Sequence, residues 1–117
     1  MKLSEILETL DASILTKNND MTMDFPRVGA SDLMSDILAG LSEGGILVTG
    51  LATLQVVKTA MIAGITGVVF VRNKKPAQDV IDLAESEGIP LLTSPLSMFV
   101  SCGRLYGKGM PGLNNRR

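Results

Sequence analysis

Two short apolar runs, with a helical pattern between them, dominate the middle of the chain. Residues 46–48 and 68–71 are continuous apolar segments rich in β-branched side chains, which is typical of strands covered on both faces. Apolar residues recur at helical spacing over residues 56–62, and polar side chains occupy the other side. A helix between two such strands predicts a right-handed crossover that makes the strands parallel. The sequence therefore predicts an α/β fold.

Similar patterns extend on both sides of this unit. Helical spacing of apolar residues predicts further helices over residues 3–10, 31–41, 76–87 and 94–105. Shorter patterns predict strands over residues 12–16 and 89–93, and an edge strand or irregular segment over residues 21–30.

The order of these elements predicts a layered α/β/α single domain with a mainly parallel sheet over residues 1–107. Residues 108–117 are rich in glycine, and we expect them to form an irregular, mobile C-terminal tail. Among the side chains expected to be buried are Leu33, Leu38 and Leu41 on the second predicted helix, and Phe99 and Val100 on the last.

The ends of the predicted helices carry recognisable signals. Ser31 and Thr53 are expected N-caps, because their hydroxyls accept hydrogen bonds from free amides of a first helical turn. Pro76 is expected as a first helical residue. Gly64 is expected in the left-handed conformation just past its helix, and Gly88 is expected to end the next one.

Composition and charge exclude several classes of function. The net charge of −1 gives no basic field that would attract nucleic acid. The chain has no histidine and one cysteine, Cys102, so it forms no internal disulfide and no zinc site. The apolar runs are shorter than the roughly 20 residues of a membrane helix, and the N-terminal segment lacks the pattern of a signal peptide. We therefore expect a cytoplasmic protein with no membrane contact, no metal and no cofactor.

Four predicted turns follow the carboxyl ends of strands, where ligands bind in open parallel sheets. Helix N-termini at these turns offer free amides and partial positive charge to an anion. The turns therefore form a candidate ligand-binding rim whose residues are Ser31, Asp32, Thr49, Gly50, Thr53, Arg72 and Ser94. The alternative is that the hydroxyl residues only cap helices, since the chain has no glycine-rich phosphate fingerprint.

The turn at Thr49-Gly50 leads from the central strand into its helix. We expect Gly50 to be required there, either for a positive φ or for a close neighbour. Catalytic residues are not predicted. Without histidine a general base would have to be a carboxylate or lysine of shifted pKa, Asp32 is explained as a charge in a first helical turn, and Cys102 has no histidine to activate it.

Several segments resemble stand-alone DRTGG-domain proteins over residues 1–107. They are residues 31–39, 48–51, 55–60, 69–76, 88–92, 97–99 and 103–106. The resemblance implies a fold similar to the N-terminal domain of the HPr kinase/phosphorylase. Related domains occur within phosphate acetyltransferases and between the CBS domains of a class of inorganic pyrophosphatase, as accessory, regulatory or dimer-forming modules.

The chain departs from the motifs that name this family. Leu51-Ala52 follows Gly50 where Asp-Arg is expected, and residues 71–73 follow the next strand where Thr-Gly-Gly is expected. The resemblance therefore transfers no ligand-binding or catalytic residue. It implies a non-catalytic regulatory or protein-interaction module, self-associating as a homodimer and accessory to a metabolic or redox enzyme system. The alternative is a sensor that binds a nucleotide or phosphometabolite at the rim.

Overall fold

The computed structural model describes residues 1–40 and 43–113, and it contains one sheet in the strand order β1-β5-β4-β3-β2. The strands are β1 (Ser13–Ile14), β2 (Val28–Ala30), β3 (Ile46–Thr49), β4 (Gly67–Phe70) and β5 (Leu91–Thr93). Strands β2 to β5 pair in parallel, and β1 adds to β5 in the antiparallel direction. The predicted α/β fold with a mainly parallel sheet is confirmed.

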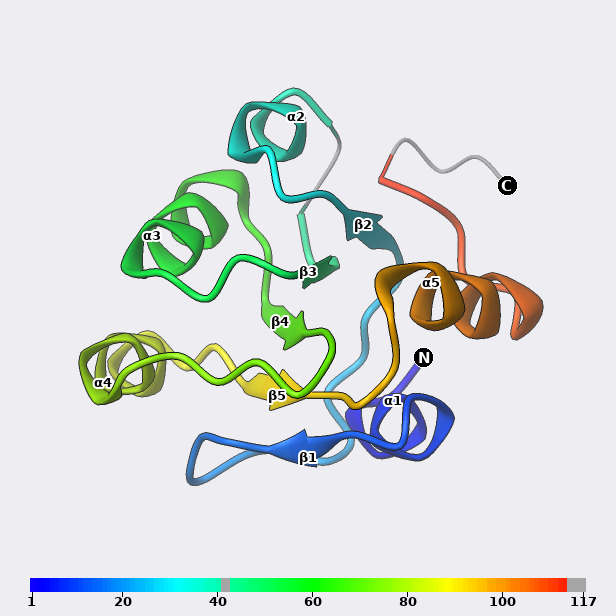
Figure 1. Ribbon diagram of the computed structural model, residues 1–117, viewed down its shortest axis with the longest axis horizontal. Coiled ribbons are helices and arrows are strands. Elements are labelled where there is room, and N and C mark those ends of the chain that lie inside the picture. The colour runs from blue at the N-terminus through cyan, green and yellow to red at the C-terminus, as the bar shows by residue number, and fades with distance from the viewer. Residues whose placement is uncertain (41–42, 114–117) are drawn as a thin grey trace.

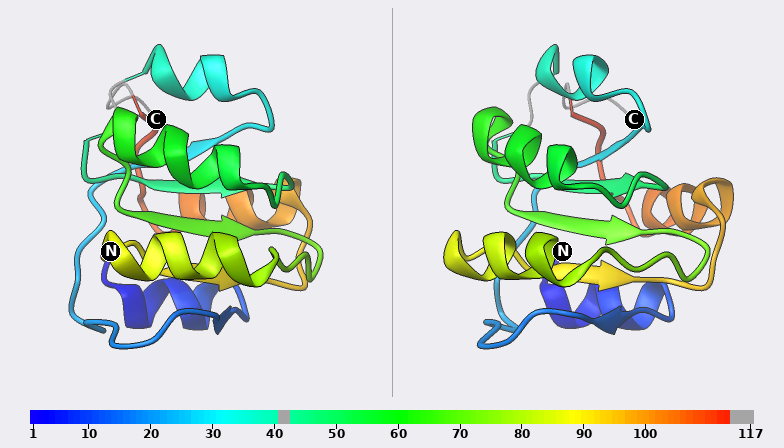
Figure 2. Two further views of the ribbon diagram at one scale, coloured as in Figure 1. Left: turned by 90° about the vertical axis from the view of Figure 1, so that its left-hand side faces the viewer. Right: turned by 60° about the vertical axis from the view of Figure 1, so that its left-hand side comes forward.

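Helices cover both faces of this sheet (Figure 1). They are α1 (Leu3–Thr9), α2 (Met34–Leu38), α3 (Leu54–Ala63), α4 (Gln78–Ser86) and α5 (Met98–Gly107). Helices α2, α3 and α4 lie on one face, and α1 and α5 lie on the other, with β3, β4 and β5 pointing the same way between them (Figures 1 and 2). The predicted three-layer arrangement is confirmed.

The central strands are buried on both faces, which explains their continuous apolar sequence. Every residue of β3 and β4 is buried. Alternate side chains enter two separate cores: Leu47 and Val68 pack under α3, while Val48 and Val69 pack under α1 and α5. Each apolar residue of these two strands is therefore buried in the core on one side of the sheet or the other.

Two of the predicted helix-end signals are confirmed. Gly64 follows α3 with a φ of 76°, and Gly88 lies just beyond α4 with a φ of 68°. Thr53 is the N-cap of α3 by backbone geometry, although its side chain makes no capping hydrogen bond. Pro76 is not a first helical residue, because Ala77 is the N-cap of α4 and the helix begins at Gln78.

The helix predicted from Ser31 starts later and is shorter. Helix α2 begins at Met34 and its N-cap is Leu33, whereas the Ser31 hydroxyl accepts a hydrogen bond from the Leu33 amide at 2.9 Å. Leu33 and Leu38 are 59% and 49% exposed, so their predicted burial is wrong, and the prediction for Leu41 lies outside the described residues. The cause is that residues 31–33 remain in the loop after β2.

The last helix also begins later than predicted. Ser97 is its N-cap, and the Ser97 hydroxyl accepts from the Val100 amide at 3.2 Å. Ser94 still continues the strand pairing, because its amide donates to the Phe70 carbonyl at 2.9 Å. This shift places Phe99 and Val100 on the outside of α5, so their predicted burial is wrong.

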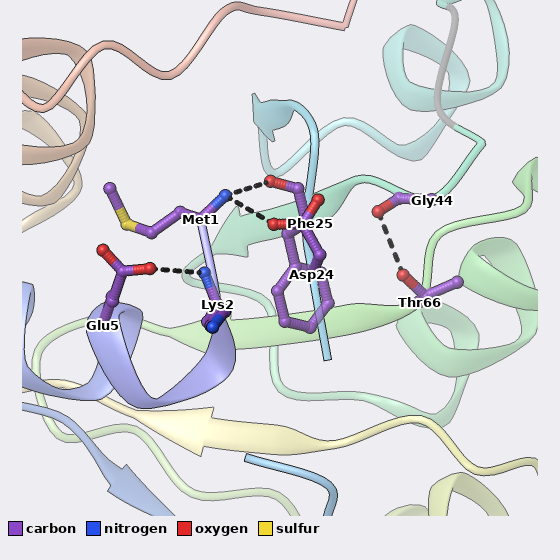
Figure 3. Close-up of polar contacts among 7 residues, drawn as sticks. All are labelled: Met1, Lys2, Glu5, Asp24, Phe25, Gly44 and Thr66. Atoms are coloured by element: carbon purple, nitrogen blue, oxygen red, sulfur yellow. Dashed lines mark hydrogen bonds and ion pairs between the residues drawn. The ribbon is translucent and has the colours of Figure 1, made fainter. Parts of the chain in front are cut away.

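The segment before β2 is irregular but anchored. Phe25 is fully buried, and its carbonyl accepts from the Met1 nitrogen at 3.0 Å. The same nitrogen donates to Asp24, while the Lys2 amide donates to the Glu5 carboxylate (Figure 3). The Phe25 amide returns a bond to the Met1 carbonyl at 2.8 Å. These bonds tie the start of α1 to the segment that carries the Phe25 ring.

Beyond α5, residues 110–113 pack against the sheet. Met110 is only 4% exposed, and the Val28 amide donates to the Pro111 carbonyl at 3.0 Å. A parallel bridge pairs Val28 with Gly112. Residues 110–113 are therefore held against the sheet, whereas Lys108 and Gly109 are exposed, and residues 114–117 lie outside the described part of the chain. The tail boundary at residue 107 stays a prediction.

Candidate functional site

The carboxyl ends of the parallel strands meet at one edge of the sheet (Figure 2). The Asp32 carboxylate, just after β2, bridges to the end of β3. Its Oδ1 accepts from the Gly50 amide at 2.6 Å and from the Thr49 hydroxyl at 3.0 Å. The Thr49 oxygen in turn accepts from the Leu51 amide at 3.2 Å. Asp32 therefore holds the turn that follows β3.

Hydrogen bonds of Lys74 extend this network to the next strands. The Lys74 ammonium donates to the Gly50 carbonyl at 2.8 Å, and the Lys74 carbonyl accepts from the Thr93 hydroxyl at 2.8 Å. The Asn73 amide donates to the Ser94 carbonyl at 2.8 Å. Side chains and backbone thus connect the ends of all four parallel strands, and most of the polar atoms they bring together bond one another.

Three of the seven predicted rim residues come together, namely Asp32, Thr49 and Gly50. The Ser94 side chain does not join them, because it is fully buried and its hydroxyl donates to the Leu10 carbonyl at 2.6 Å. The Ser31 hydroxyl does not join them either, because its bonds within residues 1–40 and 43–113 are to the nearby Leu33 backbone.

The two remaining predicted residues border the network. Along the chain, Thr53 follows Leu51 by two residues and Arg72 directly precedes Asn73, and both are exposed. The candidate rim is therefore smaller than the prediction, and its accessible groups are the side chains of Asp32, Thr53 and Arg72.

Sequence reasoning missed Lys74. It treated residues 72–75 as one basic turn and selected Arg72 as its charge. The structure turns sharply here, because Arg72 and Asn73 have φ values of 54° and 58°. Asparagine is one of the few residues that tolerate this left-handed conformation. Asn73 was therefore the available signal that the lysine after it folds back onto the sheet edge.

Gly50 does not have the positive φ that was one of its two predicted roles. The described glycines with positive φ are Gly44, Gly64, Gly88 and Gly109. A Cβ added to Gly50 would lie 3.4 Å from the Asp32 carboxylate and 3.5 Å from the Lys74 ammonium, which is ordinary van der Waals contact. The backbone therefore does not require glycine here. The neighbouring Asp32 and Lys74 side chains do not require it either, so the second predicted role, a close neighbour, also finds no support.

The described residues offer little for catalysis or metal binding. Over residues 1–40 and 43–113, no three His, Cys, Asp or Glu side chains gather closely enough to hold a metal ion. Burial raises the pKa of the half-buried Cys102 thiol, which keeps it protonated and weakly nucleophilic at neutral pH. None of the helices in this part of the chain is long and apolar enough to cross a membrane.

Comparisons with known proteins point to one family. The sequence model of the DRTGG domain matches residues 5–105. A similar solved structure comprises the CBS and DRTGG domains of the regulatory region of Clostridium perfringens pyrophosphatase, complexed with its activator diadenosine tetraphosphate. The TM-score is 0.73 at 20% identity, covering 99% of this chain and 50% of that one. The chain thus spans about half the length of that structure, and the similarity shows the fold alone. No curated protein matches the chain.

Proposed function

Because the chain belongs to the DRTGG family, we propose that it is a non-catalytic regulatory or protein-interaction module that forms a homodimer. We propose further that it acts in the cytoplasm, without a cofactor, as an accessory to a metabolic or redox enzyme system. The similar pyrophosphatase structure is a regulatory region, which supports this role. The internally bonded strand ends also support it, because a catalytic site needs polar groups that remain available to a substrate.

The observation that carries the proposal is an apolar surface on α5. Phe99 is 86% exposed, and Tyr106 and Val100 are also exposed. Gly103 lies between Phe99 and Tyr106 along the helix, and nothing would lie within 4 Å of a Cβ added there. At spacings of four and three residues, Phe99, Gly103 and Tyr106 share one side of α5. The outer side of α5 is therefore apolar and has room at its centre.

A second copy of the chain fits this surface. In a two-fold symmetric pair each copy presents the same patch, so the aromatic side chains of one α5 meet those of the other. The missing side chain at Gly103 allows the two helix backbones to approach closely. Aromatic side chains are the residues that most often dominate the binding energy of interfaces. We therefore place the dimer interface on α5.

Replacing Phe99 by serine should abolish most of this association. We expect the wild-type protein to sediment as a dimer at high micromolar concentration and the Phe99→Ser variant to show a dissociation constant raised at least about tenfold, a loss of about 1.4 kcal/mol. Ile62→Ser is the matched control, since Ile62 is 77% exposed but lies on α3, in the opposite layer. A monomeric wild-type protein, or equal effects of the two substitutions, would contradict the proposed interface.

The second candidate function is a sensor for a nucleotide or phosphometabolite at the strand-end rim. The nucleotide activator in the similar structure favours it, as does the position of Arg72 and Thr53 beside the Lys74 network. In this case an anionic group would bind near these residues and the amides of the α3 N-terminus.

A thermal-shift panel of nucleotides and sugar phosphates separates the two functions. A ligand at about 100 times its dissociation constant stabilises the fold by roughly 2.7 kcal/mol, and Arg72→Ala should remove that stabilisation. A panel without shifts would argue against the sensor and leave the interaction module.

A further inference from the structure

Residues 110–113, which we name the clasp, cross the outer edge of the sheet at β2. Figure 1 shows this segment, the red end of the described chain, leaving α5 and passing β2 towards α2. Met110 packs into the core beneath α1 and α5, whereas Leu113 packs against the core beneath α2 and α3. Between them, Pro111 and Gly112 pair with Val28. The clasp therefore covers the edge strand β2, whose backbone groups would otherwise be open to pairing with another strand.

Two glycines make room for the Leu113 side chain. A Cβ added to Gly29 would lie 2.5 Å from Leu113 Cδ1, and a Cβ added to Gly40 would lie 3.2 Å from Leu113 Cβ and Cδ1. Neither glycine is among those with positive φ. Their lack of a side chain therefore serves to leave space, and together they form a seat sized for a leucine side chain.

The seat extends beyond Leu113. A hollow of about 320 Å³ is lined by the β2 edge, Asp36, Ile37, Gly40 and Leu113. Asp36 is the charged residue among its lining, so the hollow has room for another side chain and favours a basic one.

We propose that the β2 edge is a docking site for an extended segment of a partner protein, with the clasp as its built-in competitor. The partner segment runs parallel to β2, as the clasp does, and places a leucine-like side chain between Gly29 and Gly40. A lysine or arginine beside it faces Asp36. Addition of a strand to an exposed sheet edge is a common mode of peptide recognition, in which backbone bonds give affinity and side-chain seats give specificity. This proposal does not depend on the α5 interface.

The clasp is built so that it can be displaced. The connection from α5 is Lys108-Gly109, both exposed, and Gly109 has a φ of 96°. Nothing lies within 4 Å of a Cβ added to Gly109, and the Gly109 amide donates to the Tyr106 carbonyl at 3.0 Å, so this connection is bonded to the end of α5 rather than to the sheet. A partner competes with a tethered segment, and its apparent affinity falls in proportion to the fraction of molecules with an open edge. The clasp therefore lowers the apparent affinity of the β2 edge for a partner segment.

A labelled peptide with the sequence of residues 109–117 is a suitable probe, since it carries the leucine and, further along, two arginines. The protein variants all carry Phe99→Ser, so that pairing through α5 does not contribute. In fluorescence anisotropy, Leu113→Ser should bind the peptide at least about tenfold more tightly than the protein with an intact clasp, because its seat is empty. A peptide with serine in place of the leucine should bind Leu113→Ser at least about tenfold more weakly.

The double variant Gly29→Ala/Leu113→Ser tests the seat itself. Without the leucine side chain the added methyl group has space, so the variant should fold, as circular dichroism can verify, but its seat is filled and peptide binding should be lost. No binding to Leu113→Ser, or equal binding of the two peptides, would overturn the docking site. Association of Leu113→Ser with an intact-clasp chain in sedimentation would place a second copy on the edge and overturn the assignment to a partner protein.

Discussion

Replacing Gly67 by alanine is expected to destabilise the fold by about 2–3 kcal/mol, as an overpacked core does. Gly67 opens the central strand β4, and a Cβ added there would lie 2.7 Å from Phe25 Cε1 and 2.9 Å from Cζ. The Phe25 ring is fully buried, and its backbone is bonded to Met1. The ring therefore cannot move aside without disturbing the start of α1, and urea denaturation should show the loss as a lowered midpoint.

Gly103→Ala, made in the Phe99→Ser background, is the matched control for this substitution. A Cβ added to Gly103 meets nothing within 4 Å, and the residue lies inside α5 without a positive φ. Alanine has the higher helix propensity, so this change should stabilise the protein by up to about 1 kcal/mol. A Gly67→Ala midpoint equal to that of the control would show that the Phe25 ring is free to move.

The central unit of the fold could be predicted because its signals are local. Residues 46–48 and 68–71 are apolar without interruption, and Gly64 marks the helix end between them. Strand burial and the parallel crossover follow from these neighbours in sequence, and the structure confirms both.

The errors arise where contacts between distant segments override a local signal. Ser31 has the chemistry of an N-cap, but residues 31–33 stay in a loop that Asp32 bonds to the turn at Gly50. Phe99 has the hydrophobicity of a core residue, but the late start of α5 turns it outward. The space-making roles of Gly29 and Gly67 depend on side chains far along the chain, which no local pattern contains.

The candidate rim shows the same limit. The sequence correctly indicated that the turns after the strands meet, because the carboxyl ends of parallel strands share one edge. It could not indicate that the charged side chains of Asp32 and Lys74 would both hydrogen-bond to the backbone of Gly50. The binding role of the predicted rim residues and the similarity to the HPr kinase N-terminal domain stay predictions. The regulatory role is a proposal supported by the family match.

Ser94→Ala is expected to destabilise the protein by about 1–3 kcal/mol, although the sequence suggested Ser94 as a ligand-binding residue. The Ser94 side chain is fully buried, donates to the Leu10 carbonyl at 2.6 Å and accepts from the Leu96 amide at 3.2 Å. Alanine removes the hydroxyl and leaves both the Leu10 carbonyl and the Leu96 amide without this partner, and a buried polar group left without a hydrogen bond costs about that much. The hydroxyl thus joins the end of α1 to the loop after β5.

The matched control is Ser31→Ala, since Ser31 came from the same prediction but its hydroxyl bonds to the Leu33 backbone in a partly exposed turn. Its effect should stay within about 0.5 kcal/mol. Urea denaturation of both variants, with the ligand panel repeated on each, separates structure from binding. If Ser94→Ala keeps the wild-type midpoint, the buried hydroxyl does not hold α1 to the sheet and the structural role assigned to Ser94 is wrong.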